Sequence, residues 1–303
     1  MRLDTKNKNE FSNTPSLKPE GRSLFVIKIG GNVLDDESSL QTFLENFASV
    51  KAKKILVHGG GKIATKIGQQ LGIQPNYING RRITDAATID LVTMVYGGLV
   101  NKKLVAKLQA YNCNAIGVTG ADANIIPATK RPVVNPVSEN TTAAASLQNT
   151  VSLGTGIDYG FAGDVDSSKV GASNLKLLLE NGLVPVVAPL THDGKGQILN
   201  TNADTIASSL ALALSELYDV RLIYCFDKKG VLENVADENS VINIITKDKY
   251  QQLLKENKLF DGILPKIDNA FAAIDSGVKE VLIGDAKDLL QNVTNNTIGT
   301  LIR

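Results

Sequence analysis

The strongest constraint on the fold of this sequence is the alternation of short apolar runs with longer segments of helical periodicity. The runs are rich in Val and Ile and occupy residues 24–29, 54–57, 115–118, 184–190, 219–226 and 279–284. A strand that is apolar at almost every position needs both faces of its sheet covered. Strands that alternate with helices pair in parallel. The sequence therefore predicts an α/β fold with a mainly parallel sheet and helices on both faces.

The composition favours small-molecule chemistry over binding to a polymer or a membrane. A chain of 303 residues, 43% of them hydrophobic, can bury one large core or two adjoining ones. The 32 Lys and Arg residues nearly cancel the 31 Asp and Glu residues, so no strong net field exists to hold a nucleic acid. Since no run of about 18 apolar residues occurs, a membrane span is not expected.

The cysteines and the N-terminus indicate a cytoplasmic protein. Cys113 and Cys225 lie far apart and outside any CxxC pattern, which argues against a disulfide framework or a structural zinc site. Residues 1–22 are polar, contain Pro15 and Pro19, and lack the apolar centre of a signal peptide. We expect them to form a disordered tail.

Two lobes are expected after the tail, with a soft boundary in the polar loop at 194–197. The lobes would be residues 23–195 and 196–303, with sheets that are continuous or nearly so. The segment 132–160 is rich in Ser, Thr, Asn and Ala and has weak periodicity, so a hairpin with a mobile loop is expected there. A lid over a substrate and a tolerated surface insertion are both open interpretations of it.

Two of the predicted strands run directly into glycines. VIKIGGN places Lys28 before Gly30 and Gly31, and KILVHGGGK places Gly59–Gly61 before a helical pattern. Unhindered N–H groups at a helix start form an anion site, and open α/β sheets bind ligands at this edge. A lysine in an ordinary turn is the alternative for the first motif. His58 is interpreted as a structural, hydrogen-bonded residue.

Two arginines precede one further predicted helix, and three alternating polar residues lead into another. Arg81 and Arg82 suit bidentate carboxylate recognition, although solvated surface charge is the commoner use of such a pair. Asn200, Asn202 and Asp204 alternate through a strand-like entry into a helix, and would share one face only while the chain stays extended. Asn202 or Asp204 could also be a simple helix cap.

The last two candidate segments lie in the second half of the chain. Asp227 and Gly230 follow a strand in LIYCFDKKGVLEN, and Lys266 lies in the first turn of a helix in FDGILPKIDNA. Taken alone, Lys266 is an ordinary solvated lysine.

In their joint order these motifs resemble the N-acetylglutamate kinases of the amino acid kinase superfamily. The resemblance covers about residues 24–303 and rests on KIGGN, VHGGGK, NGRRITD, VNKKLV, ENGLVPVV, NTNAD, FDKKGVL and DGILPKI. Each motif is weak alone, and the order makes the match specific. The resemblance implies a three-layer αβα sandwich, with the acyl-amino acid bound by residues 23–195 and ATP bound by residues 196–303.

The resemblance also implies a role for each candidate residue. Lys28 and Lys266 would neutralise the transferring phosphoryl group, and Asp204 would hold both lysines. The acyl-glutamate would be bound by Gly60, Gly61, Arg82 and Asn200. ATP would be bound by Gly30, Gly31, Asp227, Lys228, Lys229, Gly230, Val231 and Leu232. No dedicated metal ligand is expected, because Mg²⁺ would arrive on the phosphates of ATP.

The implied reaction is ATP-dependent phosphorylation of the side-chain carboxylate of N-acetyl-L-glutamate, a step of arginine biosynthesis. A carboxylate is already a nucleophile, so catalysis reduces to alignment and charge stabilisation. Kinases for N-succinylglutamate or an N-acyl-aminoadipate would keep nearly every motif. A catalytically silent arginine-sensing domain would not need Lys28, Lys266 and Asp204. An NAD-dependent oxidoreductase is disfavoured because no GxGxxG follows the first strand.

Three segments depart from the resembling family. Ala123 stands where the family often has a glycine, and the segment 132–160 exceeds the usual hairpin. Arginine-inhibited members have an extra N-terminal helix, but residues 1–22 lack a helical apolar stripe. We therefore expect no feedback inhibition by arginine through an N-terminal helix.

The helical stretch from Ala86 to Ala110 suggests how the chain assembles. Gly97 and Gly98 lie at its centre, where each glycine costs about 1 kcal/mol relative to alanine. The corresponding helix of the resembling family lies at a twofold interface, which implies an isologous homodimer. A helix break or a tight crossing within the subunit is the alternative.

Overall fold

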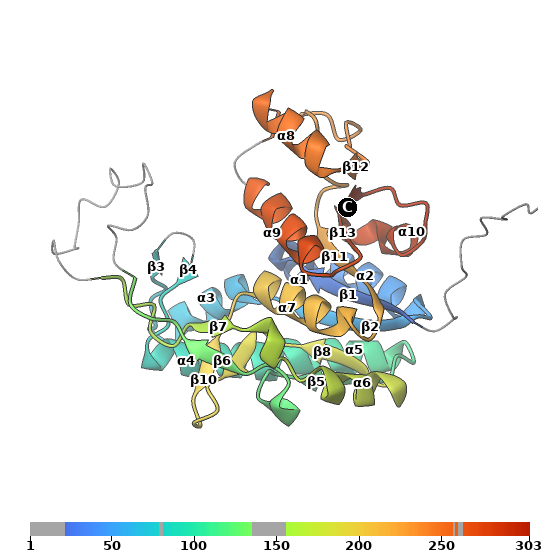
Figure 1. Ribbon diagram of the computed structural model, residues 1–303. Helices are drawn as coiled ribbons and strands as arrows, with labels where there is room; N and C mark the ends of the chain where they lie inside the picture. The colour runs from blue at the N-terminus through green and yellow to red at the C-terminus, as the bar shows by residue number, and fades with distance from the viewer. Residues whose placement is uncertain (1–21, 79–80, 135–155, 235, 257, 260–262) are drawn as a thin grey trace, which may run out of the picture.

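The computed structural model describes residues 22–78, 81–134, 156–234, 236–256, 258–259 and 263–303, which are coloured in Figure 1. A single eight-stranded sheet has the order β12-β14-β13-β11-β1-β2-β8-β5. Its neighbouring strands are parallel except for β13 and β14. The strands are β1 (Ser23–Ile29), β2 (Lys53–His58), β5 (Ala115–Val118), β8 (Val184–Val187), β11 (Asp219–Phe226), β12 (Ile244–Ile245), β13 (Glu280–Asp285) and β14 (Thr300–Ile302).

Helices cover both faces of this sheet, and each face has its own apolar core. One core lies under α6 (Ala172–Glu180), α7 (Ala203–Ser215), α8 (Lys247–Lys255) and α9 (Leu264–Asp275). The other lies under α1 (Gly31–Asp35), α2 (Glu37–Ser49), α3 (Gly61–Gln70), α4 (Ala86–Val92), η1 (Thr93–Val100), α5 (Asn101–Ala110) and α10 (Leu289–Asn292). Helix α7 crosses β1, β2 and β11 (Figure 1). The predicted αβα sandwich is confirmed.

The first strand, β1, occupies the centre of the sheet between β2 and β11. Leu24 and Val26 belong to the core under α7, whereas Ile27 and Ile29 belong to the opposite core. Successive strand side chains alternate between faces, so Lys28 shares the face of Val26 and points toward α7. The two halves of the chain therefore meet in one continuous sheet, at the strand that carries Lys28.

Three helix ends carry residues that are typical of such positions, and one of them, Asn202, is a cap candidate from the sequence. Asp85 caps α4 by accepting a hydrogen bond of 2.8 Å from the Thr88 amide. Asn202 caps α7 by accepting one of 2.7 Å from the Asp204 amide. Gly277 follows α9 with φ at 117°, a conformation that favours glycine.

Two predicted elements differ from the structure. The strand expected at 184–190 leaves the main sheet after Val187, because Pro189 has no N–H to donate to a neighbouring strand. Residues Leu190–His192 instead form β9, which pairs with β10 (Ile198–Asn200). The stretch from Ala86 to Ala110 is helical throughout, but it winds as a π-helix over η1.

The segment expected to form a hairpin is closed at its base by β6 (Ala128–Lys130) and β7 (Gly163–Val165). Its predicted mobile loop falls within residues 135–155, outside the described residues, as does the tail before Arg22. The remaining short elements are β3 (Tyr77–Ile78), β4 (Arg81–Arg82), η2 (Asp122–Asn124), η5 (Ser167–Lys169) and η6 (Ala286–Asp288). Within the described ranges, no helix is long and apolar enough to cross a membrane.

Candidate active site

A cavity of about 500 Å³ opens between the carboxyl end of β2 and the start of α7. Open α/β sheets bind ligands at the carboxyl ends of their strands. Six residues to which the resemblance gives a role in catalysis or acceptor binding line this cavity: Gly60, Gly61, Arg82, Asn200, Asp204 and Lys266. The fold thus brings together the predicted acceptor-binding residues and two of the predicted catalytic residues from distant parts of the chain.

The glycine loop after β2 is supported from behind by a buried polar pair. His58 is fully buried, and its Nδ1 lies 2.7 Å from the carbonyl oxygen of Gly59. Because a carbonyl only accepts, Nδ1 carries the proton and Nε2 accepts from the Asn101 amide at 3.1 Å. The same amide donates to the Val186 carbonyl at 2.9 Å. Burial lowers the pKa of His58 to about 4, so the ring is neutral near pH 7.

The conformation of this loop requires glycine at position 60. Gly60 has φ at 152°, and a Cβ there would lie 2.9 Å from Cδ1 of Tyr96. Tyr96 comes from η1 and also lines the cavity. The π-helix therefore places an aromatic ring against the glycine loop, with Asn101 directly after it.

Arg82 is anchored in the cavity wall by three acceptors. Its Nη2 donates to the Gly61 carbonyl at 3.1 Å, to Thr65 Oγ1 at 2.8 Å and to the Tyr77 hydroxyl at 2.5 Å. The guanidinium also lies 4.8 Å from the centre of the Tyr77 ring. Arg81 lines the same cavity but is exposed. Arg82 is therefore the arginine with a fixed orientation.

Asn200 ties three segments together beside the cavity. Its side-chain amide donates to Thr84 Oγ1 at 3.0 Å, and its main-chain N–H donates to the Phe161 carbonyl at 2.8 Å. Thr84 is fully buried directly before α4. These contacts join the β10 end to the segment that carries Arg82.

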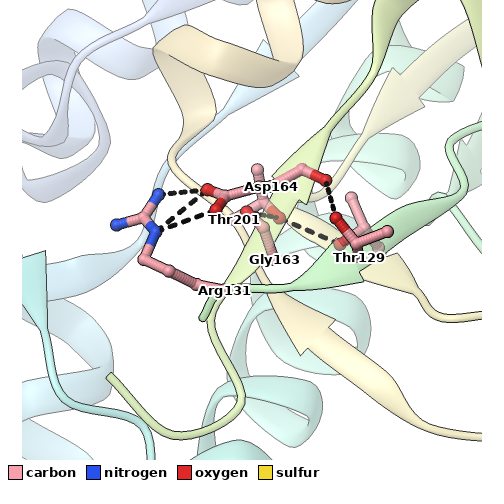
Figure 2. A network of polar contacts seen from close by, with 6 residues as sticks. Thr129, Arg131, Gly163, Asp164 and Thr201 are labelled. Carbon is pink, nitrogen blue, oxygen red and sulfur yellow. Dashed lines mark hydrogen bonds and ion pairs between the residues drawn. The ribbon is translucent and has the colours of Figure 1, made fainter. Parts of the chain in front are cut away.

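Figure 2 shows a further polar network at the base of the hairpin. Arg131 reaches across to Asp164 on β7, and its Nε donates to Asp164 Oδ1 at 2.9 Å. Thr201 continues the network by donating to the Gly163 carbonyl at 3.1 Å. Arg131 lines the cavity and lies 5.3 Å from the centre of the Tyr159 ring. The hairpin base thus contributes a third guanidinium to the cavity wall.

The two predicted catalytic lysines converge near Asp204. Lys28 is 8% exposed, and its Nζ lies 2.7 Å from Asp204 Oδ1. Lys266 Nζ lies over the ring of Phe226, which is also 5.4 Å from Lys28 Nζ. Burial lowers the pKa of Lys266, the charge of Asp204 raises it, and the charge of Lys28 lowers it. Three charged groups from β1, α7 and α9 therefore form one cluster.

The predicted nucleotide-binding segments lie side by side at the ends of β1 and β11. The Gly30 amide donates to the Cys225 carbonyl at 3.0 Å, and Asn32 donates to Asp227 Oδ2 at 2.9 Å. Asp227, Lys228 and Lys229 are exposed, Gly31 begins α1, and Gly230, Val231 and Leu232 are buried. The role of this turn in nucleotide binding stays a prediction. The described residues contain no group of three or more His, Cys, Asp or Glu side chains suited to hold a metal ion.

A sequence model of the amino acid kinase family matches residues 23–285. The chain belongs to the amino acid kinase family. The acetylglutamate kinase of Cytophaga hutchinsonii is 51% identical over 280 residues, which are 92% of this chain and 98% of the relative. The acetylglutamate kinase of Phocaeicola vulgatus is 48% identical over the same length, with the same coverage. A solved N-acetylglutamate synthase from Neisseria gonorrhoeae shares the fold with a TM-score of 0.70 at 22% identity, covering 93% of this chain and 59% of that chain.

Several side chains of this amino acid kinase were not found from the sequence. Tyr77, Tyr96, Arg131 and Tyr159 all line the cavity. None of them belongs to a recognisable ligand-binding spacing, and although Tyr96 precedes Gly97 and Gly98, that pair was interpreted only as a packing feature. Phe226 precedes Asp227 directly, and its apolar character gave no reason to separate it from the strand core.

Proposed function

We propose that this chain is an N-acetyl-L-glutamate kinase, which transfers the γ-phosphoryl group of ATP to the substrate's side-chain carboxylate in arginine biosynthesis. One arrangement carries the proposal: a fixed arginine, Arg82, lines the same cavity as Asp204 and Lys266, and Asp204 is paired with Lys28. The acetylglutamate kinases that are 51% and 48% identical over 92% of this chain support it. This family membership gives no support to the NAD-dependent alternative.

The proposed acceptor site lies in the lobe formed by residues 23–195. Arg82 binds the α-carboxylate of the acyl-glutamate, because a planar fork with three fixed contacts suits a carboxylate that does not move. Gly60 and Gly61 present main-chain N–H groups to the reacting end, and Asn200 orients its surroundings. The preformed wall holds the side-chain carboxylate in line with the phosphoryl group.

The proposed transfer forms one bond and breaks one bond. A side-chain carboxylate oxygen bonds to the γ-phosphorus of ATP, the bond from that phosphorus to the β,γ-bridging oxygen breaks, and ADP leaves. No proton needs to be removed, because the carboxylate is already ionised. Lys28 and Lys266 neutralise charge on the transferring group, and Asp204 keeps Lys28 in place.

The nucleotide is proposed to bind in the lobe formed by residues 196–303, with Gly30 and Gly31 reaching it from the other lobe. The turn from Asp227 to Leu232 lies next to these glycines through the hydrogen bond of 2.9 Å from Asn32 to Asp227. Mg²⁺ enters with ATP as part of the substrate, held by phosphate oxygens and water.

A second candidate substrate is an N-succinylglutamate. Three guanidinium groups, those of Arg81, Arg82 and Arg131, line the cavity. The α-carboxylate of the substrate needs one guanidinium group. A second carboxylate, on a succinyl group, would find another guanidinium group in the same cavity. Asp164 already neutralises Arg131, so the exposed Arg81 is the available partner.

Trapping the acyl phosphate with hydroxylamine tests both substrates. The purified chain should form a hydroxamate from N-acetyl-L-glutamate and MgATP, with one ADP per hydroxamate. N-succinyl-L-glutamate and N-acetyl-L-aminoadipate, offered at equal concentration, establish the acyl group and the chain length. An absence of hydroxamate and of ADP with every acyl-amino acid would contradict the kinase proposal and favour a silent sensing domain.

We also infer an isologous homodimer built on η1. A Cβ on Gly97 would lie 3.3 Å from Leu190 Cδ1, so this glycine serves a close contact within the subunit. A Cβ on Gly98 would meet nothing within 4 Å, and the neighbouring Met94 and Leu99 are 57% and 38% exposed. Gly98 therefore exposes main chain between two apolar side chains, and the same helix of a second subunit would pack against this surface.

Light scattering tests the assembly. The mass should be twice the 32.3 kDa of one chain at micromolar concentration. Gly98→Leu should shift the mass toward one chain, whereas Gln69→Leu, on the exposed surface of α3, should not. A wild-type mass of one chain at every accessible concentration would end the dimer proposal.

A further inference from the structure

One aromatic ring in the charged cluster is shared by both lysines. Phe226 is the last residue of β11, and the Nζ of Lys266 lies 3.4 Å from the centre of its ring. The Nζ of Lys28 lies 5.4 Å from the same centre. Every other ring with a cation contact in the described part of the chain has a single partner. Both distances fall within the roughly 6 Å over which a ring face attracts a cation.

The position of this ring is fixed by its neighbours. Phe226 stacks on Tyr224, with ring centres 6.4 Å apart and an interplanar angle of 22°. Its Cδ1 also lies 3.6 Å from where a Cβ on Gly30 would be. Gly30 is itself held to β11 through the Cys225 carbonyl at 3.0 Å. The ring therefore has two close neighbours, a second ring and a glycine backbone, that restrict its position.

The ring of Phe226 differs from a carboxylate as a partner for the ammonium group of Lys266. Lys28 is paired with Asp204, whereas the ammonium group of Lys266 makes no hydrogen bond or ion pair with any described residue. A carboxylate partner would occupy the N–H donors of Lys266. A ring face holds an ammonium through its quadrupole and leaves the N–H groups free for phosphate oxygens.

We propose that Phe226 is a positioning residue for the phosphoryl transfer, whose ring face holds the ammonium groups of Lys28 and Lys266 in the site before the nucleotide binds. This inference rests on the proposed kinase function and deepens it. The ring does not touch the reacting atoms; it acts through the two lysines. The burial that lowers the pKa of Lys266 disfavours its charge, and the ring face offsets that effect.

Fluorinated phenylalanines at position 226 separate this role from simple packing. Phenylalanine, 4-fluoro-, 3,5-difluoro- and 3,4,5-trifluorophenylalanine differ little in size, but each added fluorine weakens the negative potential of the ring face. We expect kcat to fall stepwise, by about three- to tenfold over the series, because a cation contact at a partly buried site is worth about 1 kcal/mol. KM for the acyl-glutamate should stay unchanged.

The same series at Phe271 is the matched control. Phe271 lies on α9, as Lys266 does, and is 7% exposed against Tyr250 at 5.5 Å between ring centres. It should show no trend in kcat. A flat series at position 226 in an active enzyme, or a kcat that rises with fluorination, would overturn the role of Phe226 and leave the kinase proposal standing.

A second measurement does not depend on turnover. The ε-methylene protons of Lys266 lie beside the ring face and should show an upfield ring-current shift in the nucleotide-free protein, assigned through their loss in Lys266→Arg. Phe226→Leu should return them to the ordinary lysine position. Ordinary shifts in the wild type would overturn the contact itself. Shifted protons in a protein that phosphorylates no acyl-amino acid would instead overturn the proposed function, and with it the role in transfer.

Discussion

The positive charges of the site fall into two regions that are held in opposite ways. Arg82 and Arg131 are held by hydrogen bonds that use their own donors, to Gly61, Thr65 and Tyr77 in one case and to Asp164 in the other. The lysine region has one ion pair, between Lys28 and Asp204, and an aromatic face under Lys266. We call the first region, around Arg82 and Arg131, the arginine wall, because its guanidinium groups are fixed by their own hydrogen bonds. In the second region, the N–H donors of Lys266 stay free to bind a ligand.

This difference fits the two tasks of a phosphoryl transfer. The α-carboxylate of an acceptor stays in one place, and a fixed guanidinium recognises it at little entropic cost on binding. The phosphoryl group moves and spreads its charge over several oxygens, so a compact ammonium with free donors can follow it. Residues of the wall should therefore govern KM, and residues of the lysine region should govern kcat.

The largest effect is expected from removing either lysine. Lys28→Ala and Lys266→Ala should each lower kcat by about 10²- to 10³-fold, the range for losing one donor to a transition state. Lys247→Ala, which breaks a surface pair with Asp275, is the control and should keep full activity. Steady-state kinetics on variants with native circular dichroism give the comparison. Near-normal turnover of either variant would remove that lysine from the mechanism.

The buried His58 behind the glycine loop should make the stability of the protein depend on pH. The pKa of His58 is about 4 in the folded protein and near 6.5 when unfolded, so the unfolded chain binds more protons between these values. Its contribution to stability is complete above about pH 7.5 and is lost as the pH falls toward 4. Urea unfolding should show a loss of about 2 kcal/mol between pH 7.5 and 5, with a slope that approaches roughly 1.4 kcal/mol per pH unit below pH 6.

His58→Gln checks the origin of this pH dependence. Glutamine does not titrate, so the variant should lose much less stability over the same interval, even if it is less stable at pH 7.5. An equal slope in both proteins would assign the effect to other groups.

Within the wall, Arg82→Lys should raise KM for the acyl-glutamate by about tenfold, with a smaller change in kcat. A point charge replaces a fork that is held in one orientation. Arg81→Lys is the matched control, because Arg81 lines the same cavity without the three anchoring contacts. Kinetics in which only Arg81→Lys raises KM would reverse the assignment of the two arginines.

The smallest effect should come from Tyr77→Phe. The change removes the hydroxyl that accepts from Arg82 at 2.5 Å but keeps the ring 4.8 Å from its guanidinium. Loss of one such bond is worth about 1 kcal/mol, so KM should rise no more than about fivefold while kcat stays constant. Tyr111→Phe, at the end of α5, serves as the control. A fall in kcat would show that the wall also acts in the chemical step.

The glycine loops, helix caps and strands were predictable because their signals are local. Asp85 and Asn202 cap the helices that follow them, and the runs at 24–29 and 54–57 lie within β1 and β2. Arg131 was not predictable, since its partner Asp164 is 33 residues away and the two meet only when the hairpin closes. The π-helix was also hidden, because an apolar run of the composition TMVYGGLV fits an α-helix equally well.

Ala123 shows what a departure from a family pattern does to the backbone. Its φ of 50° lies in the left-handed region, where a glycine would be unstrained. The loop therefore keeps the conformation that a glycine would allow, at a cost of about 1 kcal/mol. The sequence located the departure, and only the structure shows that alanine adopts this conformation.

The central position of β1 also sets the order of events during synthesis. β1 leaves the ribosome before the other strands of the sheet, yet it pairs with β11, and the paired residues Ser23 and Asp219 are 196 residues apart in the chain. At roughly 5–20 residues per second, one edge of β1 waits about 10–40 s for its neighbour. An apolar strand with an open edge is an aggregation hazard during that interval. Expression of this chain should therefore depend on chaperones that bind nascent chains and on the rate of translation.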